Sequence, residues 1–220
     1  MEKKKDSFSS KLSFKFMLLG DEVVGKTDVL ERYVNNSIKS NYLTTIGMDK
    51  RFVRLEINNT DVDVFITDTA GEERFRSLTK MFYKGADGIL VGFSLVEPKT
   101  LESIDYWISQ IKENCTEENP ISLVLFGTKC DEKENIKVKQ EDIDIIKNKY
   151  NLTYFEVSAK ENINIQNLFE YLIKTTIKKK GYLKNIGLPE DTSLDDIKIM
   201  RKKNQELKQK IKKEKLCLCF

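Results

Sequence analysis

The sequence contains no histidine, three prolines and one tryptophan among 220 residues. The lack of histidine excludes imidazole acid–base catalysis and histidine metal ligation for this chain. No apolar run approaches 18 residues, so no membrane-spanning helix is predicted, and the polar first 13 residues do not match a secretory signal. The four cysteines, Cys115, Cys130, Cys217 and Cys219, fall neither at zinc spacings nor in a disulfide pattern, which favours a reducing compartment.

Charge is distributed unevenly along the chain. The segment 178–215 holds 13 Lys/Arg and 6 Asp/Glu, a net of +7 in a chain of net charge +3, so the remainder carries −4. A basic tail predicts contact with an anionic surface, and a merely solvated lysine-rich segment is the alternative. The length suits one domain with extensions. We expect a polar N-terminal extension over 1–11, a domain over 12–180 and a basic tail over 181–220.

The central motif lies in the stretch Phe14–Asp28, FKFMLLGDEVVGKTD. An apolar run ends at a glycine, Gly25-Lys26-Thr27 follows four residues later, and a helix-forming segment comes next, as in the phosphate-binding pattern G-x-x-x-x-G-K-[ST]. Gly25 allows backbone N–H groups to converge on a phosphate at the positive end of the helix. Lys26 can reach the β- and γ-phosphates, and the Thr27 hydroxyl can bind Mg²⁺. The alternative is a chance match, expected in roughly 1% of chains of this length.

The rest of the chain alternates strand and helix patterns, which predicts an α/β fold with a mostly parallel sheet of six strands and helices on both faces. Lys50–Ile57 and Val62–Ile66 alternate polar and apolar residues around Asn58-Asn59, which predicts one antiparallel hairpin. Trp107 is expected in the core. Further strands are predicted at 89–95, 121–126 and 153–157, and helices at 98–115, 140–150 and 163–177.

Three more motifs follow predicted strands, at the sheet edge where the phosphate loop lies. In Asp68-Thr69-Ala70-Gly71, the acid can hold Mg²⁺ through water and the glycine N–H can approach a γ-phosphate. In Thr128-Lys129-Cys130-Asp131, the last carboxylate can accept hydrogen bonds from guanine N1–H and N2–H₂, a pair that adenine lacks. In Ser158-Ala159-Lys160, a small residue lets a backbone N–H reach guanine O6. Each motif alone could be an ordinary polar loop, but the ordered set predicts a guanine-nucleotide site.

With these motifs, residues 12 to about 177 resemble a small GTPase of the Ras superfamily, and most closely the Rab family. The Rab-like segments are Thr45-Ile46-Gly47-Met48-Asp49 in switch I, and Arg74–Thr79 and Phe82–Ala86 in switch II. The resemblance implies the P-loop small GTPase fold with a flexible C-terminal tail. It also implies GTP/GDP and Mg²⁺ as cofactors, and a switch that recruits effectors in vesicle traffic from the cytosol and the cytoplasmic face of endomembranes.

The same resemblance assigns residue roles. It implies Thr27, Thr45 and Asp68 as metal ligands, and Lys26, Thr45, Gly71 and Glu72 as catalytic. The implied nucleotide-binding set is Glu22, Val23, Val24, Gly25, Lys26, Thr27, Asp28, Thr45, Gly71, Thr128, Lys129, Asp131, Ser158, Ala159 and Lys160. The implied partners are effectors at switches I and II, an exchange factor, a GTPase-activating protein, a prenyl-binding escort and a membrane, for a monomer that binds no nucleic acid.

Several positions depart from the family pattern. Glu72 replaces the glutamine that orients the attacking water. An ionised Glu72 carboxylate has no hydrogen-bond donor for the γ-phosphate. Because nearby phosphate oxygens raise the pKa of a carboxyl group, Glu72 can instead be protonated. Glu22 and Val23 replace small residues, and Val23 is β-branched in a loop that requires unusual φ/ψ. We therefore expect weak unassisted hydrolysis, the alternative being loops that adapt and hydrolyse at the ordinary slow rate.

Other departures concern nucleotide release and effectors. Ile38 aligns with an aromatic residue that covers the guanine edge in relatives, which predicts fast GDP release. Lys50 and Thr67 replace two aromatic residues of the effector triad, leaving Phe82, so effectors are expected to bind through polar contacts or elsewhere. Thr128 replaces the usual asparagine of its motif and needs no special account.

The C-terminal segment carries two further signals. Ser193–Asp196 fits a helix capping box, and apolar residues then recur from Ile197 to Ile211 at heptad-like spacing, which predicts a short coiled coil, a transient helix or a lysine-rich linker. Cys217-Leu218-Cys219-Phe220 matches a prenylation motif on Cys217, and it also resembles Rab endings in which Cys219 is modified too. The rival functions are a hydrolysis-deficient or fast-exchanging pseudo-GTPase scaffold and a P-loop phosphotransferase.

Overall fold

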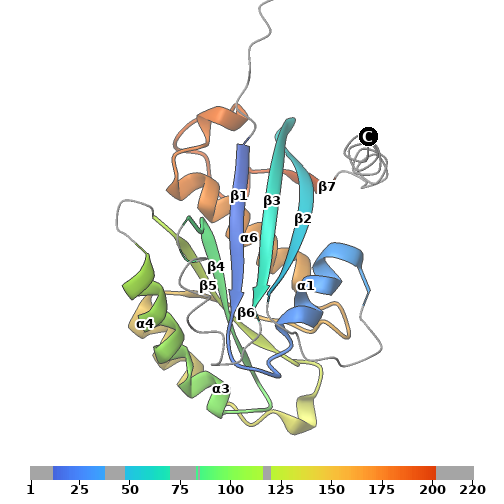
Figure 1. Cartoon of the computed structure of the whole chain (residues 1–220), viewed down its shortest axis with the longest axis vertical. Coiled ribbons are helices and arrows are strands. Elements are labelled where there is room, and N and C mark those ends of the chain that lie inside the picture. Colours follow the sequence, from blue (N-terminus) through green and yellow to red (C-terminus); the bar gives the residue numbers. More distant parts are fainter. Residues whose placement is uncertain (1–11, 38–47, 70–82, 84, 116–119, 202–220) are drawn as a thin grey trace, which may run out of the picture.

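The structure is a computed structural model that describes residues 12–37, 48–69, 83, 85–115 and 120–201. Its centre is a sheet of seven strands in the order β6-β5-β4-β1-β3-β2-β7 (Figure 1). The strands are β1 Leu12–Leu19, β2 Met48–Ile57, β3 Thr60–Thr69, β4 Gly88–Ser94, β5 Ser122–Thr128, β6 Thr153–Glu156 and β7 Ile199–Arg201. The predicted α/β class is confirmed, with one strand more than the six predicted.

Most neighbouring strands run parallel, and β2 pairs antiparallel with β3. That hairpin turns at Asn58 and Asn59, whose φ angles of 47° and 64° are both left-handed. Asparagine tolerates this conformation, and two such residues in succession match the twist of a tight hairpin. The predicted hairpin is therefore confirmed, together with the reason for its asparagine pair.

Helices cover both faces of the sheet (Figure 1). Each face of the sheet has its own hydrophobic core, and apolar residues of β1 alternate between the two. Phe14, Phe16 and Leu18 pack with α1 (Lys26–Asn35) and α6 (Ile165–Lys179). Met17 and Leu19 pack on the other face with α4 (Ile104–Asn114) and α5 (Gln140–Tyr150). The helix predicted over 98–115 is divided at Ser103. The helices are α1 Lys26–Asn35, α3 Lys99–Glu102, α4 Ile104–Asn114, α5 Gln140–Tyr150 and α6 Ile165–Lys179, with 3-10 turns η2 Lys133–Asn135 and η3 Lys184–Ile186.

The segment after α6 corrects the sequence-based expectation. Residues 181–201 are not a flexible tail, because Leu183, Ile186 and Ile197 are buried in the core shared with α1 and α6. The Ser193 hydroxyl does contact the Asp196 carboxylate at 2.6 Å, but residues 194–201, the last that the structure describes, do not form a helix. Instead β7 pairs antiparallel with β2, Ile199 opposite Ile57 and Arg201 opposite Leu55. None of the three alternatives for the segment from 193, a coiled coil, a transient helix or a linker, holds for residues up to 201, because burial of Ile197 and pairing at the sheet edge prevail over the local pattern.

The parallel strands direct their carboxyl ends toward one edge of the sheet, where the loops after β1, β3, β5 and β6 begin. In sheets of this type, ligands bind at that edge. Across the described ranges, none of the helices is both long and apolar enough to span a membrane.

Candidate nucleotide-binding site

The phosphate loop connects β1 to α1 and depends on two glycines. Gly20 has a φ of 141°, and a Cβ there would lie 2.3 Å from the Gly92 carbonyl oxygen, so a side chain cannot be accommodated. Gly25 caps α1 with a left-handed φ of 92° and no side-chain cap. The first N–H groups of a helix lack intrahelical partners, and they favour an anion at this end. The loop geometry therefore suits a phosphate.

Lys26 is buried at the start of α1. Its Nζ donates to the carbonyl oxygens of Gly20 and Asp21, at 2.8 and 2.7 Å. Burial lowers the pKa of Lys26 to about 8, although the nearby Asp68, Asp21 and Glu22 raise it. Because a desolvated ammonium gains from an additional anion, a phosphate next to Lys26 would favour its charged form.

The candidate Mg²⁺ ligands of α1 and β3 meet directly. The Thr27 hydroxyl donates to Oδ2 of Asp68 at 2.5 Å. Asp68 is 1% exposed, and its Oδ1 has no hydrogen-bond partner among the described residues. Burial raises the pKa of the Asp68 carboxyl, so a cation there would stabilise the carboxylate.

This oxygen pair fits a magnesium site completed by phosphate and water, because Mg²⁺ prefers hard oxygen ligands and takes few from the protein. The described residues contain no cluster of three or more Cys, Asp or Glu that could hold a metal by itself. The third predicted ligand, Thr45, lies outside the described residues.

The loop after β5 is joined to the phosphate loop through Thr128. Its hydroxyl lies 2.6 Å from the carbonyl oxygen of Val24 and 3.2 Å from that of Phe93, and the residue is buried. The Thr128 side chain therefore holds the two loops together, a role that its motif did not indicate. Lys129 adopts a left-handed φ of 63°, and Asp131 is partly exposed.

The loop after β6 is closed internally and anchored to α1. Ser158 exchanges two backbone hydrogen bonds with Ile163, and its hydroxyl accepts from the Glu161 N–H at 3.0 Å. Arg32 of α1 donates from Nε to the Ala159 carbonyl at 2.7 Å and from Nη2 to the Lys160 carbonyl at 3.2 Å. The structure thus brings the predicted phosphate and guanine segments to one end of the sheet.

Sequence reasoning missed two supporting side chains. Trp107, expected only as a core residue, is 7% exposed and also donates from Nε1 to Asp21 Oδ1 at 2.8 Å. Arg32 belongs to none of the sequence motifs. Neither had a signal in the sequence, because a tryptophan at helical apolar spacing and an arginine near a helix end are common in any α/β domain.

The remaining predicted positions divide into two groups. In the phosphate loop, Glu22 and Val23 are exposed, and Val23 has a φ of 56°, as expected for a loop with unusual φ/ψ. Asp28 lies in the first turn of α1. A second group lies outside the described residues: Ile38, Thr45, Gly71, Glu72, Phe82, Cys217 and Cys219, with most of the two switch segments.

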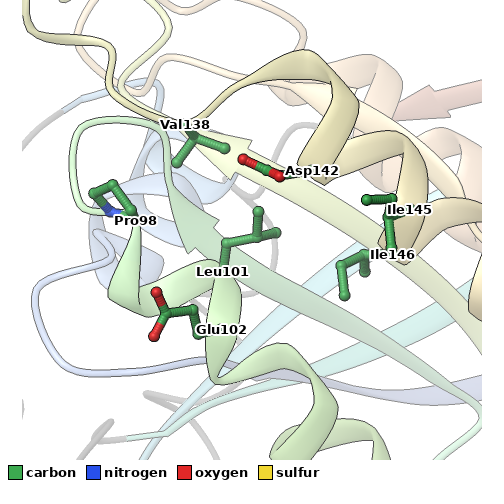
Figure 2. A pocket seen from close by; sticks show the side chains of 7 residues that line it. All are labelled: Pro98, Leu101, Glu102, Val138, Asp142, Ile145 and Ile146. Carbon is green, nitrogen blue, oxygen red and sulfur yellow. The ribbon is translucent and has the colours of Figure 1, made fainter.

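A separate pocket of about 300 Å³ lies between α3 and α5 (Figure 2). Its apolar floor includes Leu101 and Ile146, and the carboxylates of Glu102 and Asp142 also line it. It contains none of the residues predicted to bind nucleotide, so it is distinct from the site at the strand ends.

Comparisons with known proteins agree with this geometry. The family model described as Ras family matches residues 15–178. Ras-related protein Rab-13 of Bos taurus is 35% identical over 193 residues, which cover 87% of this chain and 93% of the relative. Rab-13 of Rattus norvegicus is 34% identical over 191 residues, covering 87% and 93%. Ras-related protein Rab-8A of Bos taurus is 34% identical over 186 residues, covering 84% and 88%.

Proposed function

The chain belongs to the Ras family of GTP hydrolases and is Rab-like, and from that premise we propose that it is a membrane-anchored GTP/GDP switch that recruits effectors in vesicle traffic. The observation that carries the proposal is the convergence of the phosphate loop, Asp68 and the two predicted guanine loops at one edge of the sheet. Thr128 and Arg32 fix these parts relative to one another.

Each predicted part of the site has a physical task in this proposal. The α1 terminus and Lys26 bind the phosphates. Thr27 and Asp68 would hold Mg²⁺, which supplies charge neutralisation between the phosphate oxygens when bound. Asp131 selects guanine, and the backbone of Ala159 and Lys160 faces the base. Thr45 and Gly71 would sense the γ-phosphate, so that its loss releases both switches.

The test of the proposal is the base specificity of Asp131. Asp131→Asn exchanges a carboxylate, which accepts from N1–H and N2–H₂, for an amide that can donate to a carbonyl at C2. Xanthine carries that carbonyl. We expect GTP affinity to fall roughly 100-fold or more and xanthosine triphosphate affinity to rise, measured by competition against a fluorescent GDP analogue.

Asp144→Asn is the matched control, because Asp144 is a half-exposed carboxylate on α5 paired with Lys147. It should leave both affinities unchanged. A wild-type protein that binds ATP as tightly as GTP, or an Asp131→Asn protein with unaltered preference, would contradict the assignment.

The hydrolysis step is proposed to be weak without assistance. Glu72 offers the attacking water an acceptor but, when ionised, no donor to the γ-phosphate, and the exposed Glu22 adds a second carboxylate in the phosphate loop. If hydrolysis is absent altogether, the protein is a pseudo-GTPase that acts as a binding scaffold. Single-turnover GTP hydrolysis by wild type and Glu72→Gln, with and without an activating protein, distinguishes these cases. A wild-type rate equal to that of Glu72→Gln would show that the substitution is harmless.

Membrane attachment is proposed through Cys217, or Cys217 and Cys219, together with the basic tail. One prenyl group with a polybasic segment, or two prenyl groups, suffices for stable anchoring to an anionic leaflet. This places the protein on the cytoplasmic face of endomembranes, with a prenyl-binding escort, an exchange factor and an activating protein as partners. Mass spectrometry of the native C-terminus would find one lipid or two, and an unmodified terminus would contradict the anchoring.

Effectors are proposed to bind the switches and the outer face of the β2–β3 hairpin. Lys50 and Thr67, which replace two family aromatic residues, lie directly opposite each other. The next pair toward the turn on the same face is Phe52 and Phe65, whose rings lie 5.2 Å apart, and Phe65 is 43% exposed. An effector on this face would contact the polar pair Lys50 and Thr67, at positions where the family has aromatic residues. It would contact the aromatic pair Phe52 and Phe65 beside it.

A further inference from the structure

We propose that Arg32 is a positioning residue for the guanine loop and that it limits the rate at which GDP leaves. The inference rests on the proposed function. Arg32 lies on α1, six residues after Lys26, on the helix that begins at the phosphate loop. Its guanidinium reaches a loop 127 residues further along the chain.

The guanidinium makes three hydrogen bonds, all to backbone carbonyl oxygens. Nε donates to Ala159 at 2.7 Å, Nη2 to Lys160 at 3.2 Å and Nη1 to Asn36 at 2.9 Å. A planar guanidinium has rigid, divergent donors, whereas a lysine ammonium is a compact point charge. The arrangement therefore uses a property that only arginine provides.

The contacts at Ala159 and Lys160 set the direction of the loop's N–H groups. The described chain has no cis peptide bonds, and in a trans peptide the C=O and the following N–H point in opposite directions. Holding the Ala159 oxygen toward α1 turns the Lys160 N–H away from α1. Holding the Lys160 oxygen similarly turns the Glu161 N–H away, and that group bonds the Ser158 hydroxyl. Arg32 thus fixes peptide planes in the segment proposed to face the base.

The third contact joins the C-terminal end of α1 to the same point. Asn36 ends α1 in a left-handed conformation, and its N–H bonds the Arg32 carbonyl at 3.0 Å. Its own carbonyl accepts from Arg32, and its side chain accepts from Asn162 of the guanine loop at 3.5 Å. The end of α1 and the guanine loop therefore share one anchor at Arg32.

The test compares GDP dissociation from wild type, Arg32→Gln and Arg32→Lys, using a fluorescent GDP analogue chased with excess GDP. Loss of charge-assisted hydrogen bonds predicts a roughly 10- to 100-fold faster release for Arg32→Gln. Arg32→Lys keeps the charge but cannot bridge three carbonyls, so its release should also accelerate at least several-fold. Association rates should stay within about twofold of wild type, because encounter depends on the phosphate loop.

The matched control is Arg54→Gln. Arg54 is likewise half-buried and makes two hydrogen bonds, to Asp63 across the hairpin at 2.8 and 3.4 Å, and neither bond reaches a described residue of the site loops. Arg54→Gln should release GDP at the wild-type rate while losing similar thermal stability. Equal acceleration by Arg54→Gln and Arg32→Gln would overturn the inference, since it would reflect general loosening.

The two proposals fail in different ways. If wild type retains GDP and both Arg32 variants release it at the wild-type rate, the positioning role is refuted while the switch function stands. If wild type binds no guanine nucleotide, the proposed function fails and this inference fails with it. If Arg32→Gln does not fold, Arg32→Lys alone decides the question.

Discussion

Val23 offers a quantitative test of how the phosphate loop accommodates a β-branched residue in a left-handed conformation. Its φ is 56°, in the left-handed region, and its side chain is 73% exposed. For an L-residue, this conformation costs roughly 1–2 kcal/mol because Cβ approaches the following carbonyl oxygen. Since the isopropyl group is mostly in water, its removal forfeits little burial.

Val23→Gly should therefore stabilise the protein. Glycine relieves the strain but loses roughly 0.5–1 kcal/mol more backbone entropy on folding, so the expected net gain is about 0.5–1 kcal/mol. For a chain of this size, that corresponds to a rise of roughly 1–4 °C in the unfolding midpoint. The assay is thermal unfolding in saturating GDP, with GDP affinity measured for each variant so that the contribution of binding can be subtracted.

Val23→Ala is the control that isolates the backbone term. Alanine keeps Cβ, and with it most of the strain, so it should not gain the stability that glycine gains. If Val23→Gly is no more stable than Val23→Ala after the correction for binding, the loop carries no strain at this position and the reasoning is refuted.

Three further predictions address the packing and electrostatics around the site. Ile197→Asp, just before β7, should lower the free energy of unfolding in denaturant by roughly 3 kcal/mol or more because Ile197 is buried. Met200→Asp in β7, where Met200 is 54% exposed, should change it by no more than about 0.5 kcal/mol; equal losses would mean that this segment is not docked. The pKa of Lys26 falls from 10.5 to about 8 on folding. Between these pH values the unfolded state binds more protons than the folded state, so the free energy of unfolding of the nucleotide-free wild type should rise with pH. Lys26→Met should show no such rise. If the free energies of unfolding of the two proteins change with pH in parallel, the Lys26 ammonium is not desolvated. Trp107→Phe removes the Nε1–H donor to Asp21 and should speed release of a fluorescent GDP analogue roughly 5-fold or more, and an unchanged release rate would reduce Trp107 to a packing role.

Sequence reasoning succeeded where the information is local. The strand–loop–helix of the phosphate loop, the Asn58-Asn59 turn and the buried run of β4 are each encoded within about ten residues, so periodicity and turn chemistry suffice to find them. The positions of Asp68 at the end of β3 and of the segments that follow β5 and β6 could be predicted for the same reason, since each is short and lies at a strand end.

Sequence reasoning failed where distant contacts decide the structure. The pattern from Ile197 onward repeats at helical spacing, yet Asn58 pairs with Lys198 through its N–H and its side chain, and β7 completes the sheet edge. The guanidinium carbon of Arg201 also lies 3.9 Å from the centre of the Tyr33 ring, although the two residues are far apart in the sequence. A strand of three residues has too little periodicity to be recognised before its partner is known.

The same limit explains why the anchors of the site were missed. Thr128 and Val24 are 104 residues apart, Trp107 and Asp21 are 86 apart, and Arg32 and Ala159 are 127 apart. None of these links is itself a ligand contact, so no motif records them, yet together they join the phosphate loop, α1 and both guanine loops into one connected unit. Groups connected in this way do not contribute independently. The selectivity that Asp131 confers should therefore weaken when Thr128 or Arg32 is removed, and a double-mutant cycle on GDP affinity should give a coupling energy clearly different from zero for each pair.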